Sequence, residues 1–237
     1  MIDRLLLQRE AAVHGVKLDN LAAERFDKYA QRLVDTNAHL NLTAITEPSG
    51  ILYKHFLDSL SILRYVQLKL HARCIDIGTG AGFPGAALLI ARPDLQMTLL
   101  DSTRKKLTFI QETLDSLQLQ AQTLHARAEE AGQMPVYREQ FDLVTARAVA
   151  NLRELCEYCV PFLKCGGTFV AMKSVRSEEE LAEAESAIRL LGAKMEAIHA
   201  FSLPEAGERT LILLKKISHT PPKYPRPSAK IAKQPLK

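Results

Sequence analysis

Apolar residues recur at helical spacing from the N-terminus to about residue 70. One stripe runs through Leu18, Leu21, Ala22, Phe26, Tyr29 and Leu33, and Asp19 or Asn20 is its candidate N-cap. A second stripe follows Thr46-Glu47-Pro48, where proline stands early in the first turn, and comprises Ile51, Leu52, Phe56, Ser59, Leu60 and Leu63. The pattern predicts an N-terminal helical extension over residues 1–70.

After residue 70 the pattern changes to short apolar runs that alternate with helical stretches. The runs predict strands at 74–77, 96–100, 121–125, 141–145 and 167–172, with helices near 84–92, 103–118, 127–132 and 151–163. Two further runs, 194–203 and 209–217, flank the turn signal Pro204-Glu205-Ala206-Gly207 and predict a closing hairpin. The predicted fold is therefore α/β, a seven-stranded and mainly parallel sheet with one antiparallel strand at an edge.

The end of the chain differs in composition from the rest. Residues 219–237 contain five of the 31 Lys and Arg residues, none of the 27 Asp and Glu residues, and five prolines. The remainder is thus close to neutral, and we divide the chain into residues 1–70, the domain 71–218 and the tail 219–237. Such a basic, Pro-rich segment is typical of an extended, mobile arm that contacts a polyanion, although a purely solubilising tail has the same composition.

The cysteines and the apolar runs limit where the protein works. The chain has four cysteines, no secretory signal pattern and no apolar run near 18 residues, so we expect a soluble, cytoplasmic protein. Cys156 and Cys159 form a C-x-x-C pair, but they lie on the apolar face of a predicted helix and no second Cys or His pair has zinc-finger spacing. We interpret them as buried apolar side chains and predict no metal site.

A glycine-rich loop carries the most informative chemistry. The segment Asp76-Ile77-Gly78-Thr79-Gly80-Ala81-Gly82-Phe83-Pro84-Gly85 follows a predicted strand and leads into a predicted helix. Gly78, Gly80 and Gly82 permit positive φ angles and let a ligand lie against bare backbone. The loop favours a bound nucleotide or nucleoside over a merely tight turn.

Polar residues at the ends of the next strands extend this candidate site. Asp101 ends the second strand, where a carboxylate can accept hydrogen bonds from both ribose hydroxyls, or can instead cap the helix that begins near Thr103. The loops after the third and fourth strands carry Ala128, Glu129 and Arg147. Ala128 or Glu129 could contact an adenine amino group and Arg147 a carboxylate or phosphate, although isolated residues of these types are often only surface groups.

These segments together resemble a known family. The loop 76–85, preceded by Asn41-Leu42-Thr43 and Lys54-His55-Phe56-Leu57-Asp58-Ser59-Leu60, is similar to that of the bacterial small-subunit ribosomal RNA methyltransferase G family, also called glucose-inhibited division protein B. Leu100-Asp101-Ser102, Arg127-Ala128-Glu129-Glu130 and Thr145-Ala146-Arg147 continue the similarity. The resemblance implies a class I methyltransferase, Rossmann-like, that uses S-adenosyl-L-methionine to methylate N7 of one guanine in 16S ribosomal RNA.

The resemblance also implies residue roles. Gly78, Phe83, Ala128, Glu129 and Arg147 are expected to contact the cofactor, beside Asp101. For the RNA, Asn41 and His55 are candidates, although a buried histidine that joins the helical layer to the sheet is an equal alternative. The tail supplies four further RNA-binding candidates, Lys223, Arg226, Lys230 and Lys233. The expected partner is 16S ribosomal RNA or the 30S subunit.

The absence of catalytic motifs agrees with this chemistry. Guanine N7 has a lone pair and no proton, so methyl transfer to it is a direct displacement that requires alignment and no general base. The sequence has neither an Asn-Pro-Pro-Tyr-like segment nor a Pro-Cys nucleophile. Alternative functions are a class I methyltransferase that acts on a protein or small molecule, and a nucleoside-binding module or dinucleotide oxidoreductase without methyl transfer.

Overall fold

The N-terminal third is helical, as predicted. The structure, a computed structural model, describes residues 1–147, 150–174 and 178–236. Helices α1 (Arg4–Val13) and α2 (Asn20–Leu40) begin the chain, and the Asp19 side chain caps α2 by accepting a 2.7 Å hydrogen bond from the Ala22 amide. The second predicted helix begins at Pro48 but is irregular, with α3 (Pro48–Gly50), a π-helical segment η1 (Ile51–Leu57), α4 (Asp58–Leu60) and α5 (Ile62–Tyr65).

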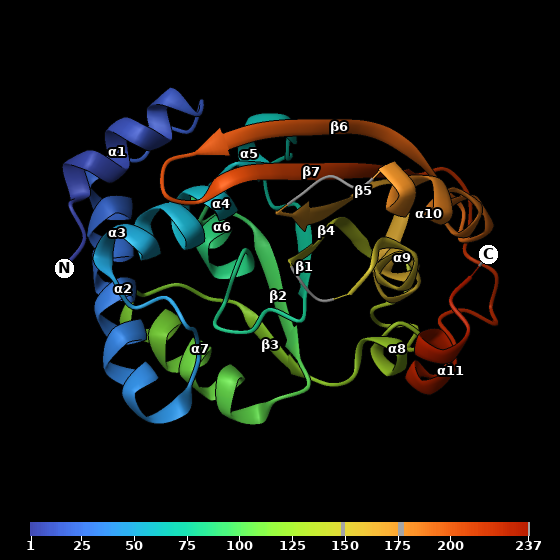
Figure 1. Ribbon diagram of the computed structural model, residues 1–237. Coiled ribbons are helices and arrows are strands. Elements are labelled where there is room, and N and C mark those ends of the chain that lie inside the picture. The colour runs from blue at the N-terminus through green and yellow to red at the C-terminus, as the bar shows by residue number, and fades with distance from the viewer. Residues whose placement is uncertain (148–149, 175–177, 237) are drawn as a thin grey trace.

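A seven-stranded sheet forms the centre of the molecule (Figure 1). Its strands are β1 (Arg73–Ile77), β2 (Gln96–Asp101), β3 (Gln122–His125), β4 (Phe141–Arg147), β5 (Leu163–Lys173), β6 (Ala193–Leu203) and β7 (Gly207–Lys216), in the spatial order β3-β2-β1-β4-β5-β7-β6. The pairs among β1 to β5 are parallel, and β7 pairs antiparallel with both β5 and β6. The predicted α/β fold and its closing hairpin are confirmed, with the reversed strand β7 next to the edge strand β6.

Helices cover both faces of the sheet. These are α6 (Gly85–Ala91), α7 (Arg104–Ser116), α8 (Ala128–Ala131), α9 (Leu152–Cys159) with a 3-10 turn η2 (Val160–Phe162), α10 (Glu178–Leu190) and α11 (Ser228–Lys233). The N-terminal helices lie with α6 and α7 on one side, and α8, α9, α10 and α11 lie on the other (Figure 1). None of the described helices is long and apolar enough to cross a membrane.

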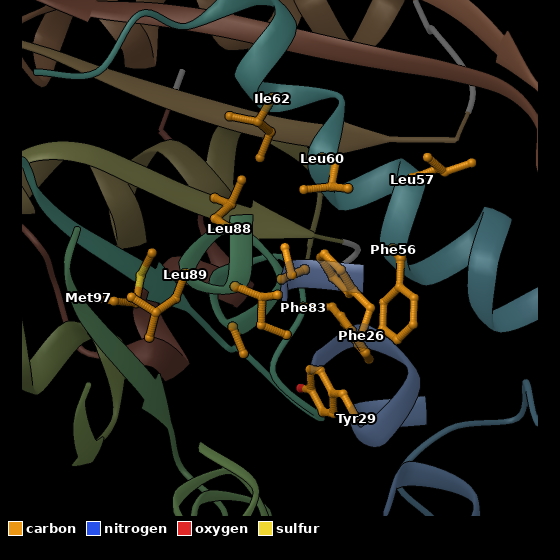
Figure 2. Close-up of a cluster of buried hydrophobic side chains, with 14 of the residues drawn as sticks. Phe26, Tyr29, Phe56, Leu57, Leu60, Ile62, Phe83, Leu88, Leu89 and Met97 are labelled. Atoms are coloured by element: carbon orange, nitrogen blue, oxygen red, sulfur yellow. The ribbon is translucent and has the colours of Figure 1, made fainter. Parts of the chain in front are cut away.

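The alternation of side chains along each strand separates two hydrophobic cores. On β5, Val170 and Met172 belong to the core beneath the N-terminal helices, whereas Phe169 and Ala171 belong to the core beneath α9 and α10. Figure 2 shows the first core, where aromatic rings from the N-terminal helices meet Phe83 of the glycine-rich loop. Residues 1–70 therefore share a core with the sheet and cover one of its faces.

The tail is docked on the domain, so the interpretation of residues 219–237 as an extended, mobile arm is wrong for the described residues 219–236. Tyr224, Ile231 and Leu236 are buried in the second core. Arg226 donates three hydrogen bonds of 2.7–2.9 Å to the Glu157 carboxylate, which is fully buried in α9. Composition gave a wrong prediction because it does not show that Arg226 pairs with a buried acid or that three apolar residues of the tail are buried in the core.

The docked position of the tail determines which of its four RNA-binding candidates are exposed. The guanidinium of Arg226 is committed to Glu157, with its side chain only 15% exposed, which contradicts the predicted role in RNA binding. Lys223, Lys230 and Lys233 are exposed. The tail is therefore a folded part of the protein that carries three lysines on its surface.

Removal of the buried partner is expected to destabilise the fold. Glu157→Ala leaves the Arg226 guanidinium without its carboxylate, which should lower the free energy of unfolding by about 3 kcal/mol. Urea unfolding of the full chain measures this loss, and the exposed Glu185→Ala on α10 is the matched control, expected to lie within about 0.5 kcal/mol of the parent. Equal stabilities of the two variants would contradict a structural role for the Arg226–Glu157 pair.

Candidate functional site: two adjoining cavities

The glycine-rich loop leaves β1 in a conformation that L side chains rarely adopt. Gly78, Gly80 and Gly82 have φ angles of 68°, 61° and 98°. At Gly82 glycine is required for a second reason, because a Cβ there would collide with the hydroxyl of Tyr29, which donates a hydrogen bond to the Ala81 carbonyl. The loop is thus held against α2 from one side while its other side stays bare.

The buried carboxylate of Asp76 holds the loop in place through two hydrogen bonds. One oxygen of its fully buried carboxylate accepts a 3.0 Å hydrogen bond from the Gly85 amide at the start of α6, and the other accepts a 2.8 Å bond from the Thr145 hydroxyl on β4. Burial raises the pKa of Asp76 to about 6, although these hydrogen bonds act to lower it. Asp76 therefore fixes the path from β1 to α6 and does not face a ligand.

The loop forms one wall of a cavity of about 450 Å³ at the carboxyl ends of β1, β2 and β4. Five of the predicted cofactor contacts line it, namely Gly78, Asp101, Ala128, Glu129 and Arg147. The cavity is also lined by Lys106, Glu154, Tyr158 and Ser228. These four residues were not predicted, because nothing in the sequence of α7, α9 or the tail indicates which residues face this space. We refer to this space as the first cavity.

Three predicted cofactor residues lie behind this wall. Gly80 and Gly82 shape the loop, and Phe83 is 4% exposed, with its ring stacked 4.6 Å from the His55 ring and 5.3 Å from the Tyr29 ring. None of the three is among the residues that line the first cavity. Phe83 therefore packs the N-terminal helices against the loop.

Asp101 supports the backbone at the end of β2, and its contact with a ribose stays a prediction. Its Oδ2 accepts a 3.0 Å hydrogen bond from the Gly80 amide and its Oδ1 a 2.8 Å bond from the Thr103 amide, so it organises the loop and the start of α7. Each carboxylate oxygen has a second lone pair, which is free to accept a ribose hydroxyl from the cavity. With apolar Ile77 and Leu100 beside it, the first cavity fits a nucleoside, and its volume is within the usual range for small ligands.

A larger cavity, of about 620 Å³, adjoins the first. Arg147 and Ala150 line both, so the two spaces meet at the end of β4. This second cavity is lined by four basic residues, Lys54, Arg147, Lys173 and Arg209, and by one acidic residue, Asp58. Lys173 pairs with Glu180 at 2.7 Å, and the cavity as a whole carries a positive charge suited to an anionic ligand.

Asp58 holds the two arginines of the second cavity in place. Its Oδ2 lies 3.2 Å from Nη1 of Arg147 and its Oδ1 lies 3.2 Å from Nε of Arg209. Burial raises the pKa of Asp58, and both guanidiniums oppose that shift. Arg147 also donates a 3.0 Å hydrogen bond to the Lys54 carbonyl. One buried carboxylate thus connects α4 to β4 and β7.

His55 is neutral and serves as a structural link. Its Nδ1 lies 3.3 Å from Nη2 of Arg147, and arginine can only donate, so Nε2 carries the proton and donates to the Thr43 hydroxyl at 2.9 Å. Burial and the charge of Arg147 lower the pKa of His55 to about 3. His55 lines the second cavity but is only 6% exposed, which favours the alternative that it joins the helical layer to the sheet.

The remaining predicted residues fall outside both cavities. Asn41 is the exposed C-cap of α2, in the left-handed conformation with φ 47°, and lines neither cavity. Cys156 and Cys159 are fully buried in the second core, where burial raises the pKa of both thiols, as their interpretation as apolar side chains requires. Within the described part of the chain, no three His, Cys, Asp or Glu side chains are grouped to hold a metal.

The neutral His55 should make the protein acid-sensitive. The unfolded histidine binds a proton below about pH 6.5 but the folded one only below about pH 3. The free energy of unfolding therefore decreases as the pH is lowered through this window, by about 1.4 kcal/mol per pH unit. Between pH 7 and 5 the parent should lose about 2 kcal/mol more than His55→Gln in urea unfolding. The exposed His39→Gln should follow the parent, and the same loss in His55→Gln would contradict the assignment.

Comparison with solved structures agrees with the fold. An S-adenosylmethionine-dependent O-methyltransferase from Thermotoga maritima matches with a TM-score of 0.54 at 17% identity, over 80% of this chain and 72% of that one. A methyltransferase of the same cofactor dependence from Aquifex aeolicus matches with a TM-score of 0.54 at 15% identity, over 75% and 97%. At these identities the similarity shows the class I methyltransferase fold.

Sequence comparison gives the family. Curated relatives named ribosomal RNA small subunit methyltransferase G include one from Lachnoclostridium phytofermentans, 46% identical over 94% of this chain and 93% of its own, and one from Desulfitobacterium hafniense, 47% identical over 100% and 97%. The family model described as rRNA small subunit methyltransferase G matches residues 22–212, which include the loop, Asp58 and both arginines of the second cavity. This chain therefore belongs to the rRNA small subunit methyltransferase G family.

Proposed function

We propose that this protein transfers the methyl group of S-adenosyl-L-methionine to N7 of a guanine in 16S ribosomal RNA. The observation that carries the proposal is the junction of the two cavities at Arg147 and Ala150. A nucleoside-sized space and a basic space open onto each other there, as transfer between a cofactor and a nucleic acid requires. The family membership supports the same activity.

The first cavity is the proposed cofactor site. Asp101 would accept hydrogen bonds from the ribose hydroxyls, and Ala128 and Glu129 would contact the adenine at the far end of the cavity. When bound, S-adenosylmethionine supplies an electrophilic methyl group on its sulfonium. Gly78 and Arg147 line the cavity on the side of β1 and β4, where it meets the second cavity, and would hold the end of the cofactor that carries this methyl group.

The second cavity is the proposed acceptor site. Lys54, Lys173 and Arg209 provide positive charge for the phosphates around the target nucleotide, and the exposed Lys223, Lys230 and Lys233 are candidates for more distant RNA contacts. A positive acceptor cavity favours a nucleic acid over a small neutral molecule as the substrate. An acceptor in the 30S subunit would make this a cytoplasmic enzyme.

Alignment carries the proposed chemistry. Guanine N7 attacks with its own lone pair, so the protein needs no general base. The side chains present agree with that, because His55 is held neutral as a donor to Thr43 and Asp58 is occupied by two guanidiniums. Their role is to keep Arg147 and the walls of the second cavity in position while both reactants are bound.

The activity is tested directly by methyl transfer to ribosomes. Purified protein and labelled S-adenosylmethionine are incubated with 30S subunits from a strain that lacks this gene, and the digested RNA is analysed by nucleoside mass spectrometry. We expect 7-methylguanosine in the 16S RNA with the parent and none with Gly80→Asp, which puts a carboxylate beside Asp101 at a positive φ angle. Cofactor binding without label in RNA would redirect the search to protein or small-molecule acceptors.

The cofactor assignment is tested by substitution of the ribose acceptor. Asp101→Ala should weaken binding of S-adenosylhomocysteine by about 1–3 kcal/mol, because it removes the ribose hydrogen bonds and the support of the Gly80 amide. Isothermal calorimetry measures the loss, with the exposed Asp115→Ala at the end of α7 as the control. Unchanged affinity in Asp101→Ala would leave Asp101 only its local role in the loop.

A further inference from the structure

The C-terminal tail lies next to the proposed cofactor site. After β7 the chain crosses the end of the second core and forms α11, which lies below α9 and beside α8 (Figure 1). Ser228, the first residue of α11, lines the first cavity together with Glu154 and Tyr158 of α9. The tail thus contributes directly to the surface of the cavity, at the end where Ala128 and Glu129 also lie.

Buried polar contacts hold the tail there. Arg138 donates hydrogen bonds to the carbonyls of Tyr224 at 2.6 Å and Thr220 at 2.8 Å. Lys216, 1% exposed, lies 3.2 Å from Glu139 and also donates to the Thr220 hydroxyl. Arg226 then pairs with Glu157, two residues after Tyr224, whose side chain is buried in the second core. All of these anchors precede Ser228, and they fix the chain that leads to the cavity wall.

The tail also packs against α8, whose first residues line the cavity. Gln133, just after α8, donates a 2.9 Å hydrogen bond to the Pro225 carbonyl. The Pro225 ring lies so close to Gly132 that a Cβ added to Gly132 would approach its Cγ to 3.0 Å. Displacement of the tail would therefore remove these contacts from the segment that carries Ala128 and Glu129.

We propose that the tail is part of the cofactor site and closes the first cavity around the adenosyl group, with Ser228 in its wall. Ser228 is half-buried, and its hydroxyl makes no hydrogen bond to the described residues, so it is free to meet a polar group of the ligand. The proposal rests on the proposed use of S-adenosylmethionine. It replaces the expectation from composition that the tail is a mobile arm for a polyanion.

A pair of neighbouring substitutions tests the wall. Ser228→Phe puts a ring into the cavity and should weaken binding of S-adenosylhomocysteine about tenfold or more, whereas Ala229→Phe puts the same ring on the exposed side of α11 and should not. Calorimetry on the full chain measures both, and apo melting temperatures report whether either variant misfolds. Ser228→Ala, which removes only the hydroxyl, should retain most of the affinity.

Ligand protection gives a second readout that needs no substitution. Because binding and docking are linked, S-adenosylhomocysteine should slow tryptic cleavage after Lys230 and Lys233 and leave cleavage after the distant, exposed Lys69 unchanged, as mass spectrometry would reveal. Equal affinities of Ser228→Phe and Ala229→Phe, or tail cleavage unaffected by the ligand, would overturn the proposal. A parent chain that does not bind S-adenosylhomocysteine would instead overturn the cofactor assignment itself.

Discussion

A single buried carboxylate, that of Asp58, holds together the parts of the molecule that make the site. It lies between the guanidiniums of Arg147 and Arg209, and so connects the N-terminal helices to strands on both sides of β5. Two guanidiniums at one place would repel each other, but a carboxylate between them offsets this repulsion and keeps both in position. The orientation of Arg147, which lines both cavities, depends on this arrangement.

Further features follow from the fixed position of Arg147. Its Nη2 donates a hydrogen bond to Nδ1 of His55, which leaves the proton of the imidazole on Nε2, where it is donated to Thr43. Its guanidinium also lies 5.2 Å from the centre of the Phe83 ring, on which His55 stacks. The positively charged guanidinium and the neutral imidazole thus both contact the aromatic residue of the glycine-rich loop, so the walls of the two cavities are connected through Phe83.

Local patterns of sequence predicted most of the fold, and failed where a segment departs from regular periodicity. The strand predicted at 96–100 is observed as β2 over Gln96–Asp101, because its residues are buried on both faces. The prediction for β5 began four residues too late, since Lys164, Cys165 and Gly166 are exposed and read as a turn. A helix was predicted over Ile51–Leu57 from its apolar stripe, but that spacing did not indicate the π-helical form of η1, in which every residue except Lys54 is buried.

Some residues of the candidate site could be predicted from the local sequence, whereas others are placed by long-range packing. Gly78, Asp101 and Arg147 lie at the carboxyl ends of strands, and the rule that ligands bind at the carboxyl ends of parallel strands was enough to predict that they lie together. Arg209 and Ser228 come from a reversed strand and from the tail, whose positions depend on long-range packing. In the tail, composition alone gave the opposite answer, because it counts charges and cannot recognise a lone buried glutamate that requires one of them.

The glycine-rich loop follows a strand of the central sheet, whereas other walls of the two cavities come from the two ends of the chain. The N-terminal segment contributes Lys54, His55 and Asp58 to the second cavity, and the tail contributes Ser228 to the first. Each terminal segment is fastened by a buried ion pair, Asp58–Arg147 at one end and Arg226–Glu157 at the other. Because a buried pair tolerates little displacement before one charge is left uncompensated, both walls are held in fixed positions. Methyl transfer that relies on alignment alone requires this rigidity on both sides of the transferred group.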